Sequence, residues 1–354
     1  MTDQTHPTTV LVTGATGYVA GWLVKALLKE GHTVHAAVRD PSNRDKVAHL
    51  DAVAAEQPGE IRYFQGDLLE DGSYHDAMQG CEIVFHTASP FIASVADPQR
   101  DLVNPAVKGT RNVLNSVNAT TSVRRVVLTS SVAAIYGDSA DMATSKTGVF
   151  TEADWNTSSN LEHQPYSYSK TQAEKAAWEI AEQQDRWNLV TVNPSLVLGP
   201  GIKPDTTSES FTIFRQMADG TLKPGAPDIT FGLVDVRDVA EAHLRAAFTP
   251  EAQGRYIISG HDSTLMDIAT ILRESFGDDW PFPRRTLPKW LLWLVGPMVN
   301  KALTRRFISR NVAYPASFDN TRSKKELGMT YRPLDATVVE MFQQLLDAGS
   351  IRKR

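Results

Sequence analysis

The chain has 354 residues, of which 42% are hydrophobic and 22% charged, and its formal net charge is −5. This apolar content excludes a disordered chain, and the acidic balance argues against a nucleic-acid partner. A single cysteine, Cys81, excludes an intramolecular disulfide and a cysteine-based zinc site. The N-terminus shows no signal-peptide pattern, and the longest apolar stretch, 290–299, is too short to span a bilayer. We therefore expect a cytoplasmic protein without a membrane span.

Short β-branched runs alternate with longer helical patterns over the first 195 residues. The predicted strands are 9–13, 32–39, 61–66, 82–87, 125–130 and 189–193, and the predicted helices are 18–30, 73–79, 101–118 and 165–184. Apolar strands separated by helices are typical of a parallel sheet that is covered on both faces. The pattern predicts an α/β fold with a Rossmann-type, doubly wound parallel sheet.

After Pro194 the composition changes. Runs 231–236 and 256–258 predict strands that rejoin the sheet, and most of the remainder is helical pieces broken by prolines. We expect one domain over 1–195, with 231–260 rejoining its sheet, and a smaller, mostly helical lobe made of 196–230 and 261–354. Ligands of such sheets bind outside the carboxyl ends of the strands, where this lobe would form the second wall of a substrate pocket.

A glycine-containing turn joins the first predicted strand to the first predicted helix. Gly14 allows a tight turn, and Gly17 lets backbone approach a pyrophosphate at the helix N-terminus. The spacing G-x-x-G-x-x-A departs from the usual G-x-G-x-x-G, so a plain tight turn is the alternative. Its place between a strand and a helix favours a dinucleotide site.

The end of the second predicted strand would read the adenosine ribose of that dinucleotide. An acidic residue there favours NAD, whereas an arginine favours the 2′-phosphate of NADP. Arg39 lies 18 residues after Gly21, so the sequence predicts NADP(H) and an NADP-binding domain over 1–195. The alternative for Arg39 is a solvent-exposed basic turn. Asp67, after the third strand, would flank the adenine or only cap the next helix.

A tyrosine and a lysine open the helix predicted at 165–184. Tyr166 and Lys170 are four residues apart and so share a helix face, whereas Tyr168 has Gln172 at that spacing. A neighbouring ammonium stabilises a phenolate, so the pair could exchange a proton with a carbonyl or alcohol oxygen. A tyrosine packed on a lysine stem is the alternative. The strand before this helix ends in two serines, whose hydroxyls could bond the same oxygen or only satisfy backbone groups.

Eight stretches carry a family resemblance: VTGATGYVAGWLVKALLKEGHTVHAAVRDP, GDL, VFHTASP, DPQRDLVNPAVKGTRNVL, RRVVLTSSVAAIYG, PYSYSKTQAEKAAW, VNPSLVLGP and FGLVDVRDVAEAHL. The chain resembles the extended short-chain dehydrogenases/reductases, most of all the dihydroflavonol reductase, cinnamoyl-CoA reductase and microbial aldehyde (ketone) reductase group. The resemblance implies a catalytic triad of Ser131, Tyr166 and Lys170, with Ser130 as the alternate serine. It implies cofactor contacts at Gly14, Thr16, Gly17, Tyr18, Arg39, Lys46, Asp67, Leu68, Thr87, Ala88, Ser89, Tyr166, Lys170, Pro194 and Ser195.

The implied activity is the NADPH-dependent reduction of a small aldehyde or ketone to an alcohol, by a monomer or homodimer. The sequence departs from the patterns of two related enzyme classes, and both departures narrow the implied activity. Residues 161–166 replace the N-W-Y-C-Y signature of cinnamoyl-CoA reductases, which argues against thioester reduction. Val132 and Ala133 stand where sugar-nucleotide dehydratases place acids. A sugar-nucleotide epimerase, a hydroxysteroid dehydrogenase and a non-catalytic NADP-binding regulator remain alternatives.

Two sets of apolar residues lie outside the predicted cofactor contacts and catalytic triad. Residues 290–299 precede Lys301, Arg305 and Arg306, and could wall the pocket, form a subunit contact or touch a membrane surface. Candidate residues for an apolar pocket wall are Phe91, Ile92, Tyr136, Phe211 and Phe214, and the alternative for each is an ordinary core position.

Overall fold

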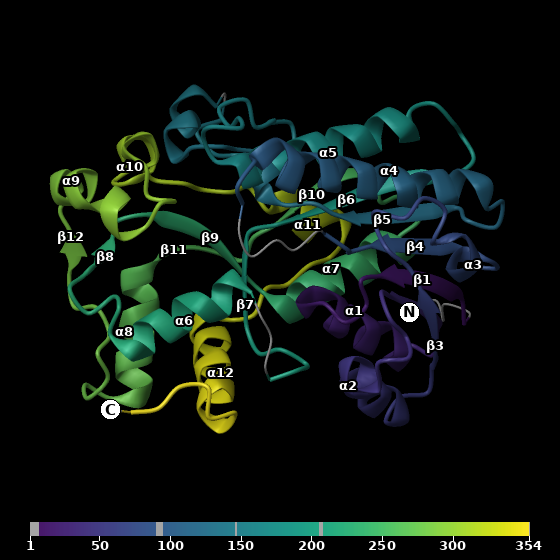
Figure 1. Ribbon diagram of the computed structural model, residues 1–354, viewed down its shortest axis with the longest axis horizontal. Helices are drawn as coiled ribbons and strands as arrows, with labels where there is room; N and C mark the ends of the chain where they lie inside the picture. Colours follow the sequence, from purple (N-terminus) through teal and green to yellow (C-terminus); the bar gives the residue numbers. More distant parts are fainter. Residues whose placement is uncertain (1–6, 90–94, 146, 205–207, 354) are drawn as a thin grey trace.

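The computed structural model describes residues 7–89, 95–145, 147–204 and 208–353 (Figure 1). Its centre is a seven-stranded parallel sheet of order β3-β2-β1-β4-β5-β6-β10. The strands are β1 (Thr9–Thr13), β2 (Thr33–Val38), β3 (Glu60–Gln65), β4 (Ile83–His86), β5 (Arg125–Thr129), β6 (Asn188–Pro194) and β10 (Gly254–Ile258). The strand order reverses between β1 and β4, which confirms the predicted doubly wound sheet.

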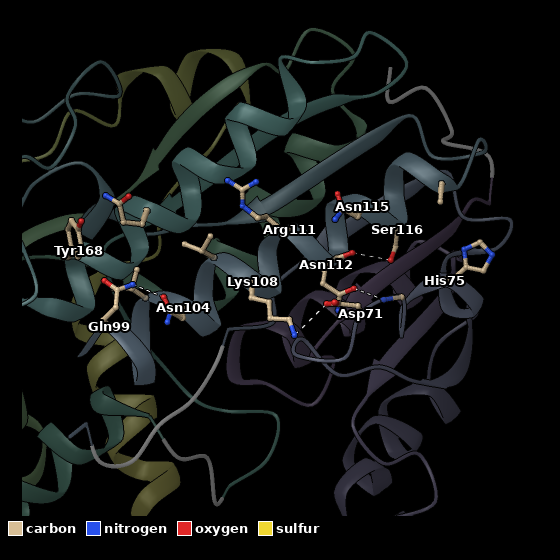
Figure 2. Close-up of a pocket in the computed structure, with 15 residues that line it drawn as sticks. Asp71, His75, Gln99, Asn104, Lys108, Arg111, Asn112, Asn115, Ser116 and Tyr168 are labelled. Atoms are coloured by element: carbon tan, nitrogen blue, oxygen red, sulfur yellow. Dashed lines mark hydrogen bonds and ion pairs between the residues drawn. The ribbon is translucent and has the colours of Figure 1, made fainter. Parts of the chain in front are cut away.

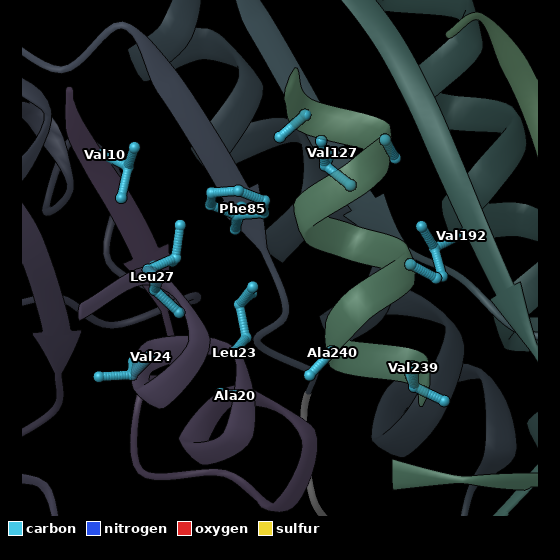
Figure 3. Packing of buried hydrophobic residues seen from close by; sticks show 14 of the residues in the cluster. Val10, Ala20, Leu23, Val24, Leu27, Phe85, Val127, Val192, Val239 and Ala240 are labelled. Carbon is cyan, nitrogen blue, oxygen red and sulfur yellow. The ribbon is translucent and has the colours of Figure 1, made fainter. Parts of the chain in front are cut away.

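Helices cover both faces of this sheet (Figure 1). One face carries α1 (Tyr18–Lys29), α2 (Arg44–Ala55) and α7 (Val236–Phe248), and the other carries α3 (His75–Met78), α4 (Asn104–Ala119) and α5 (Pro165–Ala181). Successive residues of β1 serve the two cores in turn. Val10 and Val12 pack in the cluster with Leu23 and Leu27 of α1 (Figure 3), and Leu11 packs in the cluster of the opposite face. This alternation explains why β1 is apolar throughout.

A second lobe lies beyond the carboxyl ends of these strands (Figure 1). Its helices α6 (Glu209–Asp219), α8 (Leu265–Phe276) and α12 (Leu334–Asp347) share an aromatic core that includes Phe214 and Phe342. Its small sheets are formed by β7 (Leu196–Leu198), β8 (Ala226–Pro227), β9 (Thr230–Asp235), β11 (His261–Thr264) and β12 (Thr286–Leu287). Helices α9 (Lys289–Val299) and α10 (Arg305–Asn311) form its far end, and α11 (Thr321–Glu326) returns to β10.

Only one of the two strands predicted to rejoin the large sheet does so. β10 pairs in parallel with β6, as expected for 256–258. The prediction for 231–236 is wrong, because β9 pairs with β7 and β11 in a separate three-stranded sheet. The side chains of β9 serve two cores, because Leu233 is buried in the core of the second lobe and Val234 is buried with residues of the large sheet. The apolar composition of 231–236 therefore does not decide which sheet the strand joins. The rest of the predicted division into domain and lobe stays a prediction.

Within the described ranges, no helix is both long and apolar enough to cross a bilayer.

Candidate active site

The turn between β1 and α1 brings backbone unusually close to its surroundings. Gly14 has φ +63°, and a Cβ there would lie 3.0 Å from the Cα of Ala88. Gly17 caps α1 without a side-chain hydrogen bond, and a Cβ there would lie 3.1 Å from the carbonyl oxygen of Gly14. The first N–H groups of α1 therefore have no side-chain cap, as a phosphate-binding helix N-terminus requires. The neighbouring Thr16 is exposed at the same turn.

Hydrogen bonds join the ends of β1 and β4 beneath this turn. The hydroxyl of Thr13 accepts from the backbone N–H of Ala88 at 3.1 Å and shares a 3.0 Å hydrogen bond with Nδ1 of His86. Thr87 donates its hydroxyl proton to the carbonyl of Thr13. Burial, together with the charge of Lys170, lowers the pKa of His86 to about 3, so this histidine is neutral. Thr87 and Ala88 are thus held directly against the glycine turn.

The side chain of Tyr18 contacts the second lobe. Its hydroxyl donates to the carbonyl of Gly199 at 2.6 Å, and its ring meets Phe211 edge-on at 5.4 Å. Burial raises the pKa of Tyr18 well above its ordinary value. A cofactor contact at Tyr18 would therefore use its backbone.

Two exposed cations follow β2. Neither Arg39 nor Lys46 takes part in an ion pair within the described ranges, whereas Arg44 between them binds Asp51 at 2.6 Å. Asp40, next to Arg39, accepts hydrogen bonds from the backbone N–H and hydroxyl of Ser42. Arg39 is therefore available to an anion at the end of the strand where the ribose would lie.

The loop after β3 is held by hydrogen bonds from a side chain of α4. The carboxylate of Asp67 accepts from the N–H of Leu69 at 2.8 Å, and the next helix begins only at His75, so the helix-capping alternative for Asp67 is wrong. Asn112 donates to three carbonyls of this loop, those of residues 67, 68 and 70, at 3.2, 3.2 and 2.7 Å. Leu68 packs against α4 at Gly109. Sequence reasoning missed Asn112, which is one asparagine among several on an amphipathic helix.

The two serines after β5 have different partners. Ser130 is buried, and its hydroxyl donates to the carboxylate of Glu174. Ser131 caps the short 3-10 helix Val132–Ala134 by accepting from the N–H of Ala133 at 3.1 Å. No group in the described part of the chain accepts the hydroxyl proton of Ser131. Ser131 therefore keeps a donor for a ligand, and Ser130 does not.

Tyr166 lies in the first turn of α5, which begins at Pro165, a residue suited to that position. Its side chain is 55% exposed. The ammonium of Lys170 lies 6.0 Å from the centroid of the Tyr166 ring and donates to the hydroxyl of Ser89 at 3.2 Å. The structure thus brings an open phenol and an ammonium together beside the end of β4.

Gln164, just before this helix, has a left-handed backbone with φ +52°. Its side-chain amide donates to Asp138 at 2.8 Å, which holds the strained residue in place. Asp138 is fully buried and also accepts from His163, Arg310 and Asn311 at 2.9, 2.6 and 2.7 Å. Burial raises the pKa of Asp138, and these hydrogen bonds outweigh it, so the pKa lies below its ordinary value. Asp138 thereby ties the entry to the Tyr166 helix to α10 of the second lobe.

A buried ion pair supports the other side of the site. Glu174 lies one turn after Lys170 and binds Nε of Arg255 at 2.6 Å. Its second oxygen accepts from Asn193 at 2.8 Å, and Asn193 also donates to the backbone carbonyl of Ser131 at 3.2 Å. Glu174 thus links the helix that carries Tyr166 to the segment that carries Ser131. Sequence reasoning missed this acid, although it extends the Tyr-Lys spacing by another four residues.

Pro194 and Ser195 lie at the end of β6 and are buried. The N–H and the hydroxyl of Ser195 both donate to the carbonyl of Ile258, at 3.0 and 3.4 Å. The donors of Ser195 are therefore already used within the protein.

A hollow of about 860 Å³ lies elsewhere, over the outer surfaces of α4 and α5. Its lining includes Lys108, Arg111 and Tyr168 (Figure 2) and contains none of the proposed triad. Tyr168 therefore faces a different side of α5 from Tyr166, as the spacing predicts.

For two of the five candidate wall residues the structure favours the alternative, a core position. Phe211 and Phe214 are completely buried in the core of the second lobe. Tyr136 packs against Phe150 with 4.8 Å between ring centroids. Phe91 and Ile92 lie outside the described residues.

With this geometry in place, comparison with known proteins assigns the family. Residues 10–259 match the NAD dependent epimerase/dehydratase family. The chain belongs to this family. Cinnamoyl-CoA reductase CAD2 of Medicago truncatula is 37% identical over 341 residues, which cover 95% of each chain. Dihydroflavonol 4-reductase of Gerbera hybrida is 32% identical over 284 residues, 79% of this chain and 74% of the relative.

A solved structure similar to this chain is also that of a reductase. The yeast methylglyoxal/isovaleraldehyde reductase Gre2, solved with NADPH, superposes with a TM-score of 0.78 and is 31% identical, covering 97% of this chain and 99% of that one. These matches confirm the predicted place among the extended short-chain dehydrogenases/reductases. They also confirm that this member of the epimerase/dehydratase family is an oxidoreductase.

Proposed function

We propose that the protein is an NADPH-dependent reductase that converts an aldehyde or ketone to an alcohol, using Ser131, Tyr166 and Lys170. One observation carries the proposal. The exposed phenol of Tyr166 lies beside the ammonium of Lys170, which is anchored to Ser89 at the end of β4. A substrate can reach this pair, because the phenol is open to solvent at the rim of the parallel sheet.

The residues around the glycine turn fit a phosphorylated dinucleotide. Gly14 and Gly17 stand where the turn leaves no room for a Cβ, so backbone alone would face a phosphate there. Arg39, which is exposed and has no ion pair among the described residues, follows β2, where we expect the 2′-phosphate. NADPH, when bound, supplies the hydride for the reduction. The choice of this cofactor agrees with the Gre2 reductase, whose structure contains NADPH.

The side chains of the protein orient the substrate and move the proton. The hydroxyls of Ser131 and Tyr166 donate hydrogen bonds to the carbonyl oxygen, which polarises the carbonyl. As negative charge develops on that oxygen, Tyr166 transfers its phenolic proton to it, and the product is the neutral alcohol. The ammonium of Lys170 stabilises the phenolate that remains. Ser130 takes no part in this scheme, because its hydroxyl is bonded to Glu174.

The substrate class rests on the residues as well as on the relatives. Non-acidic Val132 and Ala133 follow Ser131, so the acids of a dehydratase are absent from these two positions. The segment 161–166 differs from the signature of cinnamoyl-CoA reductases, so we favour a free aldehyde or ketone over a thioester.

The test is oxidation of NADPH, followed at 340 nm, with aromatic aldehydes, aryl ketones and keto esters, and with NADH in parallel. We expect turnover that is faster with NADPH than with NADH. Turnover with NADH alone would leave a reductase with a different cofactor. Tight NADPH binding without turnover of any carbonyl in the set would favour the non-catalytic regulator instead.

A further inference from the structure

Helix α9 exposes an apolar face that nothing in the described structure covers. Ten large hydrophobic side chains are exposed among the described residues, and half of them belong to this one helix. They are Trp290, Trp293, Leu294, Met298 and Val299. We call these five the α9 face. Met298 is 85% exposed and Trp290 is 68% exposed, so they are not core residues at the edge of a cluster.

Most of the α9 face lies along one side of the helix, and Val299 ends the helix beside it. Trp290, Leu294 and Met298 are spaced by four residues and so follow one another on the same side. The opposite side holds the helix to the protein: Leu292 is buried in a small cluster with Ile308 of α10, and Gly296 lies against that same residue. Helix α9 lies at the end of the second lobe that is farthest from β3 (Figure 1). Packing on α10 therefore leaves the α9 face pointing outward.

The segment around this face has a charge opposite to that of the whole protein. Residues 280–318 contain seven lysines and arginines and no aspartate or glutamate, although the formal net charge is −5. Arg284 and Arg310 of this segment are neutralised by ion pairs to acids outside it. The other five cations form no ion pair within the described ranges: Arg285, Lys289, Lys301, Arg305 and Arg306.

These cations accompany the aromatic side chains of the face. The guanidinium of Arg305 lies 4.6 Å from the centroid of the Trp293 ring. The ammonium of Lys289 lies 4.5 Å from the centroid of the nearby Tyr314 ring. Tryptophan and long cationic side chains both suit the boundary between hydrocarbon and headgroups, since each has an apolar body and a polar tip.

We infer that the α9 face binds the surface of an anionic lipid bilayer, with helix α9 lying in the interface. An apolar face beside lysines and arginines is the pattern of interfacial helices, which enter the headgroup boundary by roughly 5–10 Å. The helix has 11 residues. A helix of that length is roughly 16 Å long and cannot cross a hydrocarbon core of about 30 Å.

The same charges argue against a second copy of the chain as the occupant. A symmetric dimer on the α9 face would place the unpaired cations of one protomer near those of the other. Like charges held together at a contact are unfavourable, whereas phosphatidylserine and other anionic headgroups neutralise them.

The experiment is flotation of the full-length protein with lipid vesicles, of phosphatidylcholine alone and of phosphatidylcholine mixed with phosphatidylserine. We expect the protein to float with the mixed vesicles and to bind the neutral ones far more weakly. Binding should weaken when salt is raised from about 0.1 M to about 1 M, because the Debye length falls from about 10 Å to about 3 Å.

Two sets of substitutions separate the apolar and the charged contributions. Trp290→Ser combined with Trp293→Ser and Met298→Ser should reduce vesicle binding by at least about tenfold, because each change removes apolar surface that would leave water. Lys301→Gln combined with Arg305→Gln and Arg306→Gln should reduce it by about a hundredfold, at about fivefold for each cation. Leu69→Ser with Leu161→Ser is the matched control, since both leucines are exposed elsewhere and should leave binding unchanged.

Circular dichroism melting of every variant checks that the fold is intact. The inference is overturned if the protein ignores anionic vesicles, or if the serine variant floats as well as the unchanged chain. Light scattering provides a second route to rejection. A concentration-dependent dimer that the serine substitutions abolish, without vesicle binding, would assign the α9 face to a second copy of the chain.

Discussion

The open rim of the site and the interior behind it use polar side chains in opposite ways. At the rim, Tyr166 is 55% exposed and the hydroxyl proton of Ser131 has no acceptor among the described residues. In the interior, Glu174 and Arg255 are buried, and their polar atoms bind one another, other side chains and backbone. The hydroxyls that would meet a substrate keep a proton that no described residue accepts, and the groups that position them are fully hydrogen-bonded. Reactive side chains can be left without partners only where a satisfied network holds their backbone in place.

We expect the largest effect from a substitution at the open rim of the site. Tyr166→Phe removes the proton donor, and we expect turnover to fall roughly 10²- to 10⁴-fold, the usual range for general acid–base catalysis. NADPH binding, followed by fluorescence titration, and the melting temperature should stay near their original values. Tyr168→Phe is the matched control, because that ring lines the separate hollow over α4 and α5. Unchanged turnover in the Tyr166 variant would remove this residue from the mechanism.

In the buried interior, we expect a substitution to lower the stability of the fold. Glu174→Ala leaves Arg255 buried without its carboxylate, and we expect the free energy of unfolding to fall by about 3–5 kcal/mol. The measurement is urea denaturation. Glu179→Ala lies on the same helix, where the carboxylate pairs with exposed Arg111, and should change stability by less than about 1 kcal/mol.

The double variant Glu174→Ala with Arg255→Met tests the cause of that loss, since it removes the unpaired charge together with its partner. It should be more stable than Glu174→Ala alone. Equal stability of the Glu174→Ala and Glu179→Ala variants would mean that the ion pair does not support the site.

Two buried histidines make the interior sensitive to acid. Burial lowers the pKa of His86 to about 3 and that of His243, which is bonded to Thr129, to about 4. In the unfolded chain a histidine has a pKa of about 6.5, so between these values the unfolded state binds more protons. Their contribution is fully present above pH 6.5 and is lost as the pH falls toward 4. The expected slope is about 1.4 kcal/mol per pH unit for each histidine.

Urea denaturation between pH 7 and about pH 4 measures this slope, although other groups also titrate below pH 5. His243→Gln should reduce the slope between pH 6.5 and pH 5, whereas exposed His75→Gln should not change it. The same slope in both variants would show that His243 does not contribute.

The smallest expected effect is on cofactor choice. Arg39→Ser removes an exposed cation that has no ion pair among the described residues, and we expect affinity for NADPH to fall at least about tenfold, because a charge-assisted contact to phosphate is lost. Affinity for NADH should change little. Arg44→Ser is the control, since that arginine is held by Asp51. A similar loss in both variants would indicate a general electrostatic effect instead of a specific contact.

Local patterns predicted the parts of the protein that local forces build. The alternation of β-branched runs and amphipathic helices predicted the strands of the large sheet and four of the helices around it, within a few residues. The Gly14 turn lies between β1 and α1, as predicted, because its tight geometry depends on neighbouring backbone. Tyr166 and Lys170 come together because a helix places residues four apart on one side.

Such local patterns do not predict which strands pair when they lie far apart in the sequence. Residues 231–236 have the composition of a buried strand, but nothing in them specifies which sheet they join. The structure pairs β9 with β7 and β11, with Leu233 buried in the core of the second lobe and Val234 buried with residues of the large sheet. In the same way, Phe211 and Phe214 were expected at a pocket wall and instead form the core of that lobe.

By itself, the sequence determined the doubly wound fold, the glycine turn after the first strand and the tyrosine–lysine pair, since each depends on residues near one another in the chain. Only the tertiary structure distinguished Ser131 from Ser130, because the distinction depends on Glu174, 44 residues away. It also paired Glu174 with Arg255, 81 residues apart, and turned one side of helix α9 outward. Burial and hydrogen-bond partners are properties of the assembled chain, so residues of one type in similar local sequences can end with different roles.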